Sequence, residues 1–156
     1  MKFRPAAVPL ITVDPFFSVW STDDALYGGK AEHWSGRPFP IMAGIYIDGR
    51  FYSMSAFDLN DKAISTRIYQ TGLEITPTSS VYHFENEFAR VTLTFTTPLL
   101  LDRLDIMTRP VSYVAYEIEK KCDREIKLIF GISTRGCVNE RTQRVEVKKT
   151  DFSISA

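Results

Sequence analysis

The side chains best suited to chemistry in this sequence are its two histidines, His33 and His83. Hydrolysis by a serine or cysteine nucleophile needs a base, usually histidine, that is held by a third group. His83 lies in an alternating, strand-like stretch, which is typical of a histidine on a sheet face. His33 lies in the loop-like stretch Glu32-His33-Trp34-Ser35-Gly36-Arg37, and loops held by a scaffold often carry binding residues. We therefore take His33 and Trp34 as candidates for a ligand site or a domain contact, with packing of the loop onto a sheet as the alternative.

Other kinds of catalytic site lack their residues in this sequence. No Gly-x-Ser-x-Gly elbow, HExxH pattern or EF-hand loop occurs. Cys122 and Cys137 lie fifteen positions apart and outside any CxxC pair, which argues against a structural zinc site and leaves a disulfide or two free thiols open. We expect no catalytic residue, no metal site and no cofactor in this chain.

The composition is that of a folded protein with no nucleic-acid partner. The chain has 156 residues, 44% hydrophobic and 13% aromatic, with nineteen basic and nineteen acidic residues. A neutral balance without a lysine or arginine block does not supply the basic face that phosphates require, and it offers little protection against self-association. No apolar run reaches the roughly 20 residues that span a bilayer. The residues do not decide between a cytoplasmic protein and a secreted or periplasmic one whose signal peptide was removed.

The spacing of turn signals predicts an all-β fold, an antiparallel β-sandwich. Such signals recur every eight to twelve residues, with period-2 patterns between them. Asp48-Gly49 predicts a tight hairpin, because both residues tolerate positive φ. A second hairpin is expected around Asn86-Glu87. Short helical turns are possible at Ala56–Ile64 and Leu99–Asp105, and further strands are expected at Leu73–Thr76, Ser112–Ile118, Ile126–Ser133 and Arg144–Lys148.

The two ends of the chain differ in character. Prolines concentrate in residues 1–44, so we expect residues 1–65 to form a module of loops and a hairpin packed on a sandwich that begins in residues 66–156. Asp151–Ala156 alternates like a strand with no closing turn, which predicts a sandwich incomplete at its C-terminus. An unpaired edge left by missing strands would tend to pair with another chain.

Exposed aromatic side chains would allow a different function. A flat ring can stack on the apolar face of a sugar, and Trp20, Trp34, Tyr27 and Tyr52 are the candidates. Core packing is the alternative for all four, because large aromatics dominate buried area. Exposed, coplanar rings would favour a carbohydrate-binding module.

Six segments, taken in order, resemble glutaminase A-like proteins over roughly residues 4 to 140. They are Ala7–Trp20, His33–Gly36, Ala43–Tyr52, Gln70–Thr78, Leu93–Leu100 and Thr108–Tyr113, the last containing Arg109-Pro110-Val111-Ser112-Tyr113. Members of that family pair an N-terminal β-sandwich region, of the supersandwich kind, with a C-terminal helical toroid, and their named activity is hydrolysis of glutamine to glutamate and ammonia.

The resemblance implies a non-catalytic accessory domain that packs on a catalytic toroid of the same parent protein. No catalytic residue of the family falls on a position of this chain. Arg109 precedes a proline, which favours an extended backbone, and its guanidinium could pair with a carboxylate across sheets or domains. Trp20 and Trp34 would pack the N-terminal loops on the sandwich or on the toroid.

Overall fold

The computed structural model describes residues 5–57, 66–138, 140, 142–146 and 148. Strands dominate these residues and confirm the all-β prediction. The elements are β1 (Val8–Asp14), β2 (Phe17–Ser21), β3 (Glu32–His33), β4 (Ile41–Ile47), β5 (Arg50–Ser53), β6 (Tyr69–Ile75), β7 (Ser79–Glu85), β8 (Ala89–Thr96), α1 (Leu104–Met107), β9 (Tyr113–Lys120), β10 (Ile126–Ile132) and the 3₁₀ turn η1 (Thr134–Cys137).

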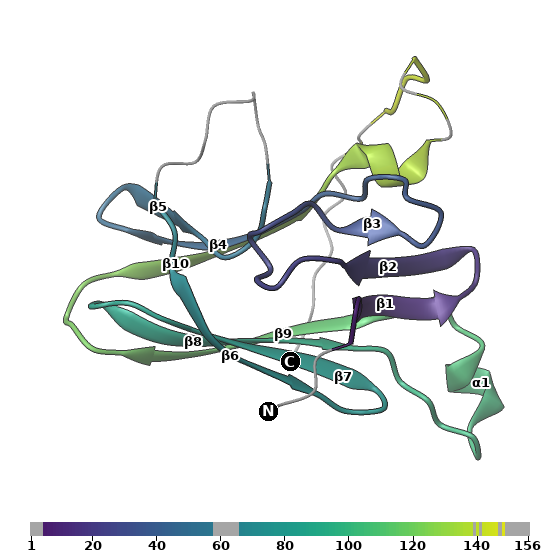
Figure 1. The fold of residues 1–156 in the computed structure, drawn as a ribbon, viewed down its shortest axis with the longest axis horizontal. Helices are drawn as coiled ribbons and strands as arrows, with labels where there is room; N and C mark the ends of the chain where they lie inside the picture. The colour runs from purple at the N-terminus through teal and green to yellow at the C-terminus, as the bar shows by residue number, and fades with distance from the viewer. Residues whose placement is uncertain (1–4, 58–65, 139, 141, 147, 149–156) are drawn as a thin grey trace.

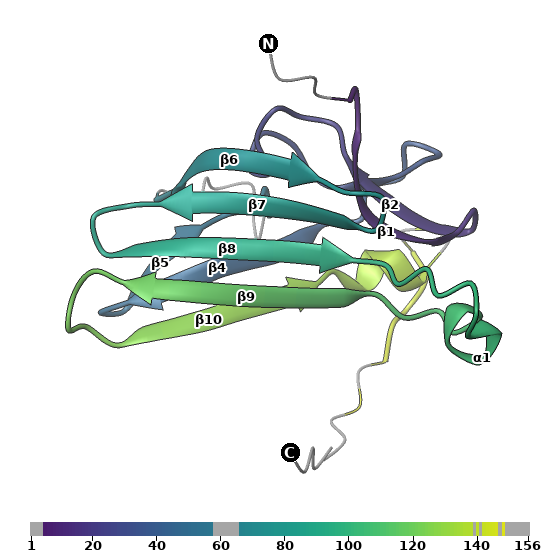
Figure 2. The same ribbon diagram turned by 90° about the horizontal axis from the view of Figure 1, so that it is seen from below.

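The strands form three antiparallel sheets arranged as a sandwich. Sheet A has the order β1-β2-β3, sheet B the order β10-β4-β5, and sheet C the order β6-β7-β8-β9. Sheet C forms one layer, and sheets A and B lie side by side across from it (Figure 1). The view from below shows the strands of sheet C running along the length of the molecule, with α1 at one end (Figure 2). The predicted β-sandwich is therefore present.

Both predicted hairpins are confirmed. At the β4–β5 turn, Asp48 has φ of 49° and Gly49 has φ of 77°, the left-handed geometry that an Asp-Gly pair tolerates. At the β7–β8 turn, the Asn86 side-chain oxygen accepts hydrogen bonds from the backbone N–H groups of Phe88 and Ala89, both at 2.9 Å. This asparagine supplies turn contacts that the period-2 pattern alone does not predict.

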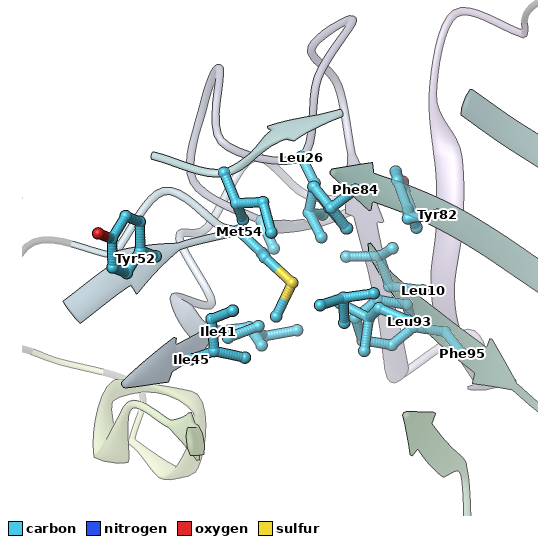
Figure 3. Packing of buried hydrophobic residues seen from close by; sticks show 14 of the residues in the cluster. Leu10, Leu26, Ile41, Ile45, Tyr52, Met54, Tyr82, Phe84, Leu93 and Phe95 are labelled. Atoms are coloured by element: carbon cyan, nitrogen blue, oxygen red, sulfur yellow. The ribbon is translucent and has the colours of Figure 1, made fainter. Parts of the chain in front are cut away.

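The core lies between sheet C and the opposite layer. Along β8, Val91, Leu93 and Phe95 are buried while the threonines between them are half-buried, as the alternation predicts. Met54, which directly follows β5 and is fully buried, lies between residues of the two layers (Figure 3). An unbranched thioether suits this position because it fills irregular gaps.

Contacts between the two layers close one long side of the sandwich, and the other long side is open. On the closed side, Ser53 forms a bridge with Arg67, and the Gln70 side-chain oxygen accepts a 2.9 Å hydrogen bond from the Leu26 backbone N–H. On the other side, β9 is the edge of sheet C and β10 is the edge of sheet B. The five-residue connection between them turns from one layer to the other, and neither edge is paired within the described part of the chain.

Two predicted segments differ from the structure or lie outside it. The strand predicted at Arg144–Lys148 is wrong: the described residues of that stretch belong to no strand and are exposed, and Val145 is the sole apolar side chain among residues 144–146. The stretch alternates valine with charged residues, but its described side chains are exposed, so they bury no face against a sheet. Asp151–Ala156 and most of Ala56–Ile64 fall outside the described residues. The helical turn near Leu99–Asp105 forms later, as α1. The division at residue 65 stays a prediction.

Candidate functional site

A tight turn after β3 presents the two residues favoured in the sequence. His33 pairs with Val19 of β2, and the Gly36 N–H then donates a 2.8 Å hydrogen bond to the His33 carbonyl oxygen. The His33 N–H donates to the Arg37 carbonyl, also at 2.8 Å, which closes the reversal. Gly36 has φ of 77°, a conformation that strains residues with a Cβ. The turn therefore holds Trp34 and the residue after it at its tip.

This turn forms one wall of a pocket of about 290 Å³, which we call the β2–β3 pocket. η1 and the residues after it form the opposite wall. The base is aromatic, with the Phe17 and Phe39 rings 6.1 Å apart in an edge-to-face arrangement. A Cβ on Gly136 would lie 2.1 Å from the Phe39 ring, so only glycine allows η1 to approach this closely. The polar lining residues are His33, Ser35, Arg37 and Arg135.

Hydrogen bonds to Ser35 orient the His33 ring. Nδ1 lies 2.7 Å from Ser35 Oγ and accepts a 3.3 Å hydrogen bond from the Ser35 backbone N–H. Nε2 is buried and has no hydrogen-bond partner among the described residues. The ring lies 5.5 Å from that of Trp34, tilted by 48°. Trp34 is 66% exposed, and its Nε1–H donates a 2.5 Å hydrogen bond to the Pro15 carbonyl oxygen.

The other two residues singled out in the sequence lie elsewhere. Trp20 is on β2 opposite Glu32, half-buried, and donates a 2.5 Å hydrogen bond from Nε1 to Ser18 Oγ. Because neighbouring residues of a strand face opposite ways, Trp20 is turned away from the pocket that Val19 lines. Arg109 lines a separate pocket of about 120 Å³ next to α1, and its Nε donates a 3.0 Å hydrogen bond to the Asp105 carbonyl oxygen.

The structure thus brings His33 and Trp34 together and leaves Trp20 and Arg109 apart from them. Sequence reasoning missed Arg37, Arg135 and the aromatic base. Arg37 belongs to the same short motif as His33, four positions further along, so a charged residue within that motif was a usable signal. Arg135 lies about a hundred positions further along, and no pattern in the sequence links it to β3.

Two known protein families match separate segments of the chain. Residues 78–156 match the family described as domain of unknown function DUF5127. The chain belongs to the DUF5127 family. Residues 1–65 match a second family, described as domain of unknown function DUF4964. No curated protein and no solved structure matches the chain.

The β2–β3 pocket joins the two matched segments. The DUF4964 segment holds β1 to β5 and supplies Phe17 and His33, whereas the DUF5127 segment holds β7 to β10 and supplies Arg135. The same is true of sheet B, in which β10 of the DUF5127 segment pairs with β4 along its whole length. The two segments therefore share one sheet and one pocket.

Shifted pKa values in the DUF5127 segment arise at surface ion pairs and at one partly buried tyrosine, and none of these residues lines the β2–β3 pocket. Hydrogen bonds from Lys121 and then Arg90 hold the pKa of the Glu85 carboxyl below its ordinary value, and Glu85 in turn raises the pKa of Arg90. The guanidinium of Arg103 lowers the pKa of Asp105, which raises that of Arg103. Burial raises the pKa of the Tyr116 phenol. Ion pairing and burial therefore account for these shifts, and ion-pair networks of a structural kind perturb pKa values as reactive sites do.

The part of the chain that the structure describes shows neither a metal-ligand cluster nor a membrane-spanning helix. It contains no group of three or more histidine, cysteine, aspartate or glutamate side chains arranged to hold a metal ion. It contains no helix long and apolar enough to cross a membrane. Cys122 is a free thiol whose Sγ lies 3.6 Å from the Phe88 carbonyl oxygen.

Proposed function

We propose that this chain is a non-catalytic β-sandwich accessory domain of a glutaminase-like hydrolase and that it packs against a helical catalytic domain of the same parent protein. The observation that carries the proposal is an apolar surface at the α1 end of the sandwich, which we call the α1-end surface. The β1–β2 turn, α1 and the segments beside α1 lie at this end (Figures 1 and 2). Its exposed large side chains, with their exposed fractions, are Phe16 (93%), Leu99 (57%), Leu100 (42%), Leu101 (73%), Leu104 (61%), Val111 (41%) and Tyr113 (57%).

An apolar cluster of this kind favours a protein partner. Single exposed apolar residues are ordinary on a protein surface, but a contiguous patch marks an interaction site. Leu99, Leu100 and Leu101 are consecutive in the chain and all three are exposed, so one short segment presents three large apolar side chains. Six segments of the sequence resemble glutaminase A-like proteins, and that resemblance supports both the glutaminase-like activity of the parent protein and the helical toroid as the packing partner.

Hydrogen–deuterium exchange of this chain and of the complete gene product tests the packing. We expect amides of residues 99–112 to exchange more slowly in the complete gene product, because a packed domain would exclude water from the α1-end surface. The exposed strand β6, which lies outside this surface, is the internal control and should exchange equally in both. Equal exchange of residues 99–112 in the two proteins would contradict the proposal.

A carbohydrate-binding module is the second candidate, and exposed Trp34 favours it. Trp34 stands in the chain between His33 and Ser35, which both line the β2–β3 pocket, and an exposed ring beside polar side chains suits stacking on a sugar and hydrogen bonding to its hydroxyl groups. The 48° tilt between the Trp34 and His33 rings gives no flat platform larger than one indole. Titration with a panel of neutral oligosaccharides, followed by tryptophan fluorescence, tests this function. A saturable change that Trp34→Ala abolishes and Trp20→Phe retains would support it, and no change would reject it.

We propose further that the open side of the sandwich pairs with a second copy of this chain through β10. Core-facing side chains are incompletely covered there: Leu128, Phe130 and Ile132 lie opposite the buried residues of β4 yet are 39%, 36% and 48% exposed. An exposed, apolar edge strand is a template for another strand. The sequence of β10 suits pairing with a second copy of itself. If two β10 strands pair antiparallel with Ile129 at the centre, Leu128 of one copy lies opposite Phe130 of the other. Lys127, the charged residue of the strand, then lies opposite Gly131 and not opposite another lysine. The zero net charge adds no repulsion.

Sedimentation analysis over a range of concentrations tests this pairing. We expect a reversible monomer–dimer equilibrium that Ile132→Lys shifts to monomer, since the charge would have to enter the joined core. Ile75→Lys is the matched control: Ile75 is 40% exposed on β6, at the opposite edge of sheet C, and its replacement should leave the equilibrium unchanged. A monomer at all concentrations, or equal effects of the two variants, would contradict pairing through β10.

A further inference from the structure

We propose that the β2–β3 pocket binds a small organic anion, a carboxylate or a phosphate ester, between the imidazole of His33 and the guanidinium groups of Arg37 and Arg135. The three side chains come from β3, from the turn after it and from η1. The proposal rests on three observations: a buried donor without an acceptor, a lining with positive charge and no negative charge, and an apolar base.

The buried donor is the Nε2–H group of His33. A neutral imidazole carries its proton on one nitrogen and accepts on the other. The Ser35 backbone N–H can only donate, and it points at Nδ1 over 3.3 Å, so Nδ1 must be the accepting nitrogen. The proton therefore resides on Nε2, which is buried and has no partner among the described residues. A buried donor without an acceptor is unfavourable, and an acceptor that reaches Nε2 as the pocket adjusts around its ligand would satisfy it.

The charge of the lining specifies an anion. Arg37 and Arg135 line the pocket, and none of the described lining residues is an aspartate or a glutamate. Arg37 Nη1 donates a 3.3 Å hydrogen bond to the Val138 carbonyl oxygen, which ties it to the opposite wall. The Arg135 guanidinium has no ion pair or hydrogen bond within the described residues, whereas Arg90 and Arg124 each pair with a carboxylate. Guanidinium groups bind carboxylate and phosphate oxygens with two parallel hydrogen bonds, so an unpaired arginine beside a free N–H suits such a ligand.

The size and the base of the pocket limit the rest of the ligand. A volume of about 290 Å³ is at the lower end for small-molecule sites and suits a short aliphatic or single-ring acid rather than a nucleotide. Phe17 and Phe39 form the base, and Phe16 lines the opening, so the part of the ligand beyond its charged group would lie on aromatic rings. The ligand class is therefore a small acid with an apolar stem.

Ligand titrations followed by two-dimensional NMR test the proposal with three probes. Phenylacetate carries the expected carboxylate and ring, phenylacetamide is its neutral isostere, and inorganic phosphate tests the other anion. We expect saturable shifts confined to residues around the pocket with phenylacetate, phosphate or both, and binding of phenylacetamide weaker by at least about ten-fold because it cannot pair with a guanidinium. Binding of phenylacetate alone would identify a carboxylate site, and binding of phosphate alone a phosphate site. Binding of neither anion, or equal binding of the amide, would overturn the proposal.

The variant Arg135→Gln tests whether the guanidinium of Arg135 binds the anion. It should weaken anion binding by about ten-fold or more without unfolding the chain, since the guanidinium is exposed and forms no hydrogen bond or ion pair with the described residues. Arg50→Gln is the matched control: it removes the same charge from an exposed position on β5, which contributes nothing to the pocket, and should leave binding unchanged. Equal weakening by the two variants would show a general charge effect and would contradict the site.

The ring nitrogens of His33 give a second readout that does not depend on a variant. Long-range ¹H–¹⁵N spectra at mildly alkaline pH should show the proton on Nε2, and the Nε2–H resonance should move downfield when the anion binds. A proton on Nδ1 would remove the free donor on which the proposal rests. An unchanged Nε2–H resonance at saturation would equally exclude His33 from the site.

Discussion

Replacement of Ser55 by alanine should destabilise the sandwich more than any other single hydroxyl deletion we consider. Ser55 lies just after β5 and is 5% exposed. Its Oγ accepts a 2.8 Å hydrogen bond from the Ala43 N–H and donates a 2.6 Å hydrogen bond to the Ile41 carbonyl oxygen. The hydroxyl thus continues the pairing of β4 beyond the point where β5 ends. Ser55→Ala would leave two buried backbone groups without partners.

The expected cost follows from those two groups. Each unsatisfied buried donor or acceptor costs about 1–3 kcal/mol, and partial relaxation of the chain leaves a total of about 2–4 kcal/mol. Domains of this size have a free energy of unfolding of about 5–15 kcal/mol, so the loss is a large fraction of the whole. With a urea dependence of about 2 kcal/mol/M, the unfolding midpoint should fall by about 1–2 M.

Urea unfolding, followed by the fluorescence of Trp20 and Trp34, measures this shift. Ser112→Ala is the control, because Ser112 makes a single 3.0 Å hydrogen bond to the Thr97 hydroxyl in a part-buried position. Its cost should stay below about 1 kcal/mol. Equal midpoints for the two variants, or a shift below about 0.3 M for Ser55→Ala, would refute the reasoning that this hydroxyl satisfies the β4 backbone.

Three further perturbations test other parts of the fold. Gly44→Ala should destabilise the fold by about 1–3 kcal/mol, because the added Cβ would lie 2.4 Å from an aromatic ring of β5 and 2.6 Å from a β5 carbonyl oxygen. Gly131→Ala is its control and should cost little, since its Cβ would meet only a flexible side chain, at 3.3 Å. Similar melting temperatures for the two variants would contradict this. Glu85→Gln tests the surface ion pairs: Lys121 holds the folded pKa of Glu85 below its ordinary 4.5, so the carboxylate stabilises the fold above that pH and loses the effect as the pH falls through the lower folded value. The difference in melting temperature between wild type and Glu85→Gln should therefore be present at neutral pH and vanish in acid, and a difference that persists in acid would exclude the ion pair as its cause. Tyr116→Phe should leave stability unchanged or raise it, because the buried Tyr116 hydroxyl has no hydrogen-bond partner among the described residues; a loss above about 1 kcal/mol would show that the hydroxyl is bonded.

The strands were predictable from the sequence where local patterns determine them. The alternation of Val91, Leu93 and Phe95 with threonines gives the strand, its buried face and its hairpin partner, and Asp48-Gly49 gives the turn without any tertiary information. Arg144–Lys148 shows the limit of this reasoning. Its alternation of valine with charged residues is typical of a strand, but a strand also needs a sheet on which to bury its apolar face, and the alternation alone does not supply one.

The candidate site was only partly predictable. His33 and Trp34 lie together because four residues of one motif form a turn, which is a local property. The approach of Arg135 depends on the pairing of β10 with β4 and on a glycine that admits the Phe39 ring. Such long-range pairing joins residues about a hundred positions apart, and no spacing rule in a single sequence predicts it.

The measurement that tests the central claim most directly is ammonia release from glutamine by this chain and by the complete gene product, at equal molar concentration. The accessory-domain account predicts release by the complete gene product and none by residues 1–156 alone. Release by residues 1–156 alone would contradict the claim that the chain is non-catalytic. Absence of release from both proteins would contradict the glutaminase-like assignment of the parent protein.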